Sequence, residues 1–73
     1  MNLNTLTASV AQQLQAALDA GQLSLGHGTD SAPDEAAWLT LWAAELPLDT
    51  ELDTRELSAE QVRAVEALLT RRL

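Results

Sequence analysis

The chain has 73 residues, with eleven carboxylates against four arginines, no lysine and no cysteine, and a net charge of -7. This balance argues against nucleic acids and anionic membranes as partners, because both are bound by basic side chains. The lack of cysteine excludes disulfides and thiolate metal ligands. Because neither a signal peptide nor a membrane-length apolar run is present, we expect one small cytoplasmic domain.

The first helix is predicted over residues 7–20. Val10 and Leu14 begin a four-residue apolar spacing that is typical of one buried helical face. Gly21 follows as a natural left-handed stop. The N-cap is left open among three polar residues: Asn4, Thr5 and Thr7.

A glycine-rich loop precedes the second helix. Gly26 and Gly28 flank the only histidine, His27, and predict a tight loop because glycine takes positive φ at little steric cost. His27, Asp30 and Ser31 are crowded into five positions with no oxyanion hole in view, so we expect no catalytic residue here. The carboxylates lack the spacing of a calcium loop, so no metal site is expected.

The second helix is predicted over residues 32–45. Ser31 and Asp34 have the spacing of a capping box, and Pro33 is tolerated in a first helical turn. Pro47 should end the helix, since the residue before a proline is disfavoured in the α region.

This helix is apolar almost all round, because only one residue between 36 and 44 is polar. Trp38 and Trp42 lie four residues apart and share one side. Two interpretations are open: both tryptophans belong to the core, or they form a contact surface for a partner.

The connection that follows is acidic, with six carboxylates and one arginine over residues 45–60. It is either a solvated linker or a surface that complements a basic protein, in which case Glu51, Asp53 and Glu56 are candidate contacts along with the tryptophans. Ser58 and Gln61 then form the capping box of a third helix.

We therefore predict an all-α bundle of three main helices. A short fourth helix over residues 49–55 is left open. Most of the core is expected to come from the following residues: Val10, Leu14, Leu18, Leu39, Leu46, Val62, Val65 and Leu69.

Several strings resemble the amino-terminal domain of the bacterial ribosomal-protein glutamine methyltransferases, the PrmB branch of the HemK group. The resemblance covers roughly residues 20–73, and the first helix matches only in character. Downstream it includes Leu46-Pro47-Leu48-Asp49, the start Leu57-Ser58-x-Glu60, and Arg71-Arg72. Its signature lies in the loop and the start of the second helix: Gly26, His27, Gly28, Thr29, Asp30, Asp34 and Glu35.

The resemblance implies that residues 1–73 form a noncatalytic substrate-recognition domain, with a Rossmann-like catalytic domain downstream. That domain would use S-adenosylmethionine to methylate the side-chain amide of a glutamine in a large-subunit ribosomal protein. This segment would bind no cofactor and be inactive alone. Its implied partners are a basic ribosomal protein and its own catalytic domain, and an exposed apolar face would also allow self-association.

Two alternatives come from other classes of protein. The string Gly28-Thr29-Asp30-Ser31 before an apolar helix resembles an acyl carrier protein, in which Ser31 would carry phosphopantetheine. Ala32 and Pro33 depart from that pattern. The other alternative is an unrelated acidic protein-interaction module.

Overall fold

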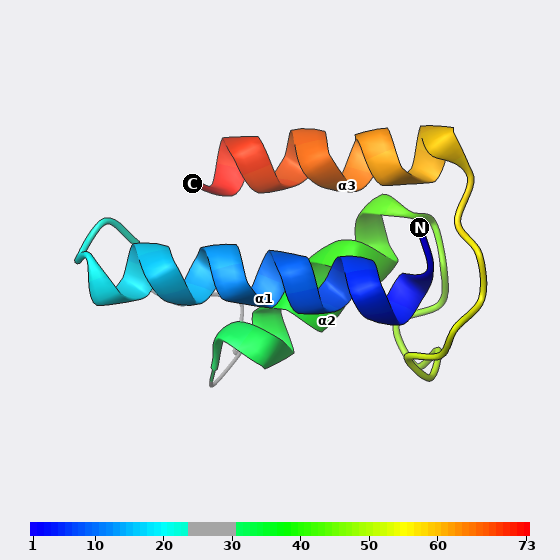
Figure 1. The fold of residues 1–73 in the computed structure, drawn as a ribbon, viewed down its shortest axis with the longest axis horizontal. Coiled ribbons are helices and arrows are strands. Elements are labelled where there is room, and N and C mark those ends of the chain that lie inside the picture. Colours follow the sequence, from blue (N-terminus) through cyan, green and yellow to red (C-terminus); the bar gives the residue numbers. More distant parts are fainter. Residues whose placement is uncertain (24–30) are drawn as a thin grey trace.

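The computed structural model describes residues 1–23 and 31–73, and these form three helices without a strand (Figure 1). They are α1 (Leu3–Asp19), α2 (Ala32–Ala43) and α3 (Ala59–Arg72). The helix α2 packs against both α1 and α3. The predicted all-α bundle is confirmed, whereas the predicted tight loop at residues 26–30 lies outside the described residues.

The helix α1 begins earlier than predicted. Its N-cap is Asn2, whose side chain accepts a hydrogen bond from the Thr5 amide at 2.7 Å. Thr7 lies buried inside the helix, and none of the three predicted N-caps is used. The cause is tertiary: the Leu3 amide, unpaired within the helix, donates to the Arg55 carbonyl oxygen at 2.9 Å.

The acidic connection forms no helix, so the short fourth helix left open over residues 49–55 is absent. Its backbone instead pairs with the start of α1. The Asn4 amide donates to the Asp53 carbonyl at 2.9 Å, and the Leu57 amide donates to the Met1 carbonyl at 3.1 Å. Figure 1 shows this yellow segment beside the amino terminus. The connection therefore supplies hydrogen-bond acceptors to the amides of Leu3 and Asn4 at the start of α1. A helix over residues 49–55 would use those carbonyl groups within itself.

Two helix starts follow the sequence prediction. Ser31 caps α2 by accepting a hydrogen bond from the Asp34 amide at 3.3 Å, with Pro33 in the first turn. Ser58 caps α3 in a complete capping box: its hydroxyl accepts from the Gln61 amide, and the Gln61 side chain accepts from the Ser58 amide. Both caps are confirmed because they depend only on local spacing.

Two helix ends share one backbone motif. Gly21 ends α1 with a φ of 73°, which confirms the predicted stop. The helix α2 ends at Ala43, two residues before its predicted end, because Glu45 takes the same left-handed conformation with a φ of 60°. The Leu46 amide then donates to the Leu41 carbonyl at 2.9 Å, which is the Schellman pattern. Glu45, and not the later proline, ends this helix.

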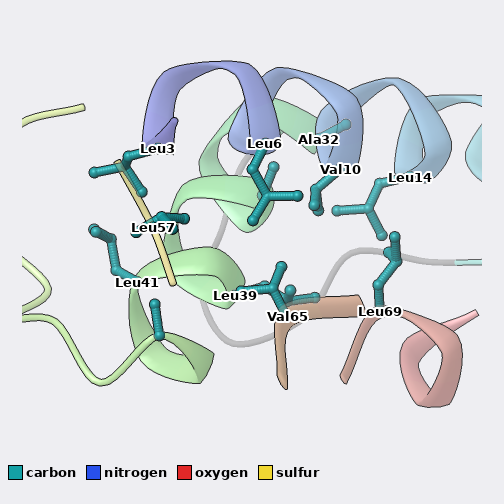
Figure 2. Packing of buried hydrophobic residues seen from close by; sticks show 12 residues of the cluster. Leu3, Leu6, Val10, Leu14, Ala32, Leu39, Leu41, Leu57, Val65 and Leu69 are labelled. Carbon is teal, nitrogen blue, oxygen red and sulfur yellow. The ribbon is translucent and has the colours of Figure 1, made fainter. Parts of the chain in front are cut away.

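The core joins all three helices and the connection (Figure 2). Leu3, Leu41 and Leu57 meet near one end, and Leu14 points toward Leu69 near the other. The first three were not predicted. The predicted core positions that are buried are Val10, Leu14, Leu39, Val65 and Leu69. Three others lie only partly buried at the edge of the cluster: Leu18, Leu46 and Val62.

Candidate functional site

The two tryptophans of α2 stack on each other. Their ring centroids lie 6.0 Å apart with an interplanar angle of 11°. Trp38 is half-buried, whereas Trp42 is 57% exposed. The interpretation that places both in the core is therefore wrong for Trp42. A large aromatic ring left this exposed in a small domain is a candidate contact residue.

Beside Trp42, a hollow of about 600 Å³ lies between the end of α2 and the start of α3, and we call it the α2–α3 hollow. The two helices are tied together there, because the Gln61 side-chain amide donates to the Ala44 carbonyl at 3.1 Å. The hollow is lined by Trp42, Ala43, Ala44, Glu45, Ser58, Glu60, Gln61 and Ala64.

Two carboxylates give the α2–α3 hollow its charge. Glu45 and Glu60 are both exposed, and within residues 1–23 and 31–73 neither carboxylate has an ion-pair partner. The last turn of α2 contains no basic residue, so no side-chain cation of α2 offsets the partial negative charge of this helix end. The hollow therefore combines negative charge with the exposed indole ring of Trp42.

A smaller hollow of about 260 Å³ is lined by both tryptophans together with Leu39, Leu68, Arg71 and Arg72. Arg72 there binds Glu35 in a bidentate pair, at 2.9 Å from Nε and 3.1 Å from Nη2. The Glu35 side chain is 1% exposed and that of Arg72 is 25% exposed. Glu35, which the resemblance singles out, thus connects α2 to α3.

The acidic candidates lie elsewhere. Glu51, Asp53 and Glu56 are on the exposed connection, and none of them lines either hollow. Glu56 accepts a hydrogen bond from the amino terminus at 2.8 Å. Hydrogen bonds from the Arg55 side chain and backbone lower the pKa of Asp53, and the same pair raises the pKa of Arg55. None of these three acidic residues therefore contributes to the α2–α3 hollow.

Glu45 and Glu60 belong to the predicted acidic stretch, but the sequence did not single out either of them, or Gln61, as a contact residue. Glu45 follows Trp42 by three residues, and that spacing alone made it a candidate neighbour. Glu60 and Gln61 could not be placed beside Trp42 until the packing of α3 on α2 was known. Within the described ranges, no group of three histidine, cysteine or acidic residues is placed to hold a metal ion. None of the helices described is long and apolar enough to cross a membrane.

Comparison with known proteins identifies relatives of this chain. It is 44% identical over 59 residues to the ribosomal protein uL3 glutamine methyltransferase of Bordetella pertussis, 46% over 54 residues to that of Burkholderia pseudomallei, and 49% over 53 residues to that of Neisseria meningitidis serogroup B. The resemblance to ribosomal-protein glutamine methyltransferases is confirmed. The alignments cover 68–77% of this chain but only 17–20% of these methyltransferases. No family model matches the chain, and no solved structure is significantly similar.

Proposed function

We propose that this chain is the amino-terminal, noncatalytic domain of an S-adenosylmethionine-dependent methyltransferase that modifies a glutamine side-chain amide of ribosomal protein uL3. The observation that carries the proposal is the set of relatives, which share 44–49% identity with most of this chain over a fifth or less of their own length. The larger remainder of such a protein has room for a catalytic domain, and the helical domain would bind and position the substrate in the cytoplasm.

Charge supports the role in substrate binding. The chain carries a net charge of -7, and ribosomal proteins are basic because they contact RNA phosphates. Opposite charges speed the encounter of two proteins and fix their orientation. The exposed indole of Trp42 adds apolar area for such a contact, or for packing on the catalytic domain.

The test compares the full-length protein with a variant that lacks residues 1–73. Methyl transfer from labelled S-adenosylmethionine to purified uL3 is measured over a range of uL3 concentrations. Loss of a substrate-binding domain should raise KM for uL3 by about tenfold or more, which equals 1.4 kcal/mol of binding free energy, and should change kcat less. A truncated protein with unchanged kcat/KM would contradict the proposal.

The isolated chain supplies a second readout. It should bind uL3 at low ionic strength, and the affinity should fall as salt is added because exposed charges are screened. Analytical ultracentrifugation of the chain at several concentrations measures whether it self-associates, as the resemblance implies. In the carrier-protein alternative, coenzyme A and a phosphopantetheinyl transferase would add the mass of the arm to Ser31; under our proposal the mass stays unchanged.

A further inference from the structure

We propose that the α2–α3 hollow binds an arginine side chain from a basic segment of the protein substrate. The proposal rests on the proposed function and names the part of the domain that meets the substrate. It also names the chemical group that is recognised.

The exposed ring of Trp42 offers a surface on which a cation can stack. Trp38 stacks on Trp42 with centroids 6.0 Å apart, so one face of the Trp42 ring is covered from within the domain. The ring is still 57% exposed and lines both hollows, so it remains accessible to a ligand. Tryptophan is the best aromatic platform for a cation, and the planar guanidinium of arginine stacks on it more readily than a lysine ammonium does.

Two carboxylates in the hollow favour a positively charged ligand. Glu45 and Glu60 come from two different helix termini and line the same hollow as Trp42. Each is exposed, and in the described part of the chain neither is neutralised by an ion pair. A guanidinium has five N–H donors, so it can stack on the ring and still donate to a carboxylate. An anionic or purely apolar ligand would leave these carboxylates uncompensated.

The two helix ends that border the hollow differ in charge. The end of α2 carries partial negative charge and has no basic residue in its last turn, so it favours a cation. The start of α3 carries the opposite partial charge. Its first turn is closed by the Ser58–Gln61 capping box, which binds amides that would otherwise attract an anion. The volume of about 600 Å³ lies in the range of small-ligand sites, about 300–1,000 Å³, and admits an arginine together with its neighbours.

The experiment measures binding of the chain to purified uL3 by titration calorimetry at low ionic strength. Trp42→Ala should weaken binding about three- to tenfold. Glu45→Gln and Glu60→Gln should each weaken it about two- to fivefold. The matched control is Glu66→Gln, which removes the same charge from the exposed side of α3 and should change affinity less than about twofold. Circular dichroism checks that each variant is folded.

Nuclear magnetic resonance tests the chemical group directly. An acetylated peptide of two arginines separated by glycines should shift the amide signals of residues 42–45 and 58–64. The same peptide with neutral citrulline in place of arginine should not. Equal shifts with both peptides, or shifts confined to residues 49–57, would overturn the arginine site.

The two proposals fail in different ways. If the wild-type chain does not bind uL3, both substrate binding and the partner named here are overturned. If it binds, but Trp42→Ala and Glu60→Gln change the affinity no more than Glu66→Gln does, only the hollow is overturned. In that case the domain meets its substrate through another surface.

Discussion

The two sides of α2 differ in what they contribute. On the side that meets the other helices, Ala36, Leu39 and Thr40 are at most 1% exposed. On the other side, Trp42 is 57% exposed although it is the larger residue and equally suited to a core. The apolar character of α2 therefore does not decide which of its residues are buried; the positions of α1 and α3 do. The buried side should determine stability, and the tryptophan side should determine binding.

The largest expected effect separates these two sides directly. Leu39→Ala should lower the free energy of unfolding by about 2–5 kcal/mol, because it removes a fully buried side chain and leaves a cavity. Trp42→Ala should lower it by less than about 1 kcal/mol, since most of the ring already contacts water and the loss is chiefly the stacking on Trp38. Urea denaturation followed by circular dichroism measures both. Similar losses in the two variants would contradict the division.

The next effect concerns the ion pair that connects α2 to α3. Glu35→Gln keeps the shape but removes the charge that faces Arg72, so we expect a loss of about 1–3 kcal/mol. The partial exposure of Arg72 lets water solvate it and places the loss below that of a fully buried pair. Glu66→Gln on the exposed side of α3 is the control and should stay within about 0.5 kcal/mol. Equal stability of the two variants would show that the pair does not hold the helices together.

Features of the fold that depend on neighbouring residues were predictable from the sequence, whereas features that depend on packing between distant segments were not. The N-caps at Ser31 and Ser58 and the stop at Gly21 were predicted because each depends on a few neighbouring residues. The predicted start of α1 was wrong. Asn2 is the N-cap because the connection, which is distant in sequence, forms backbone hydrogen bonds with the first residues of the chain. Leu3 and Leu57 entered the core for the same reason, which no local periodicity could reveal.

The candidate site was harder to predict than the fold. The exposure of Trp42 was one of two open interpretations, because a helix that is apolar all round gives no direction to its buried face. Glu45 and Glu60 came together through the packing of α3 on the end of α2. Glu35 was noticed only through the resemblance, and its partner Arg72 lies 37 residues further along the chain.

A smaller effect on stability is expected at Thr40, on the buried side of α2. Thr40 is fully buried, and within residues 1–23 and 31–73 its hydroxyl has no hydrogen-bond partner. Thr40→Val removes this unpaired polar group at nearly constant shape and helix preference, so the unfolding free energy should rise by about 1 kcal/mol. Thr7→Val is the matched control: the Thr7 hydroxyl donates to the Leu3 carbonyl at 2.8 Å, so this variant should gain nothing. A gain in both variants would indicate general apolar burial as the cause.

The smallest effect concerns Glu45, which lies just beyond the end of α2. A residue other than glycine at a φ of 60° is strained by about 1 kcal/mol, so Glu45→Gly should stabilise the fold by about 0.5–1 kcal/mol. Gly21→Ala is the reciprocal control. In the described part of the chain, no atom beyond its two sequence neighbours lies within 4 Å of the methyl group that alanine would add, so the expected loss of about 1 kcal/mol reports the backbone conformation. Both changes are measured by thermal and urea unfolding.

The same Glu45→Gly variant also tests why a glutamate stands at a position that suits glycine. If Glu45 serves the α2–α3 hollow, the variant should be more stable and yet bind uL3 about two- to fivefold more weakly, in line with Glu45→Gln. A variant that is more stable and binds equally well would show that the strain at Glu45 has no role in recognition. The two measurements together thus separate the contribution of this residue to the fold from its contribution to the site.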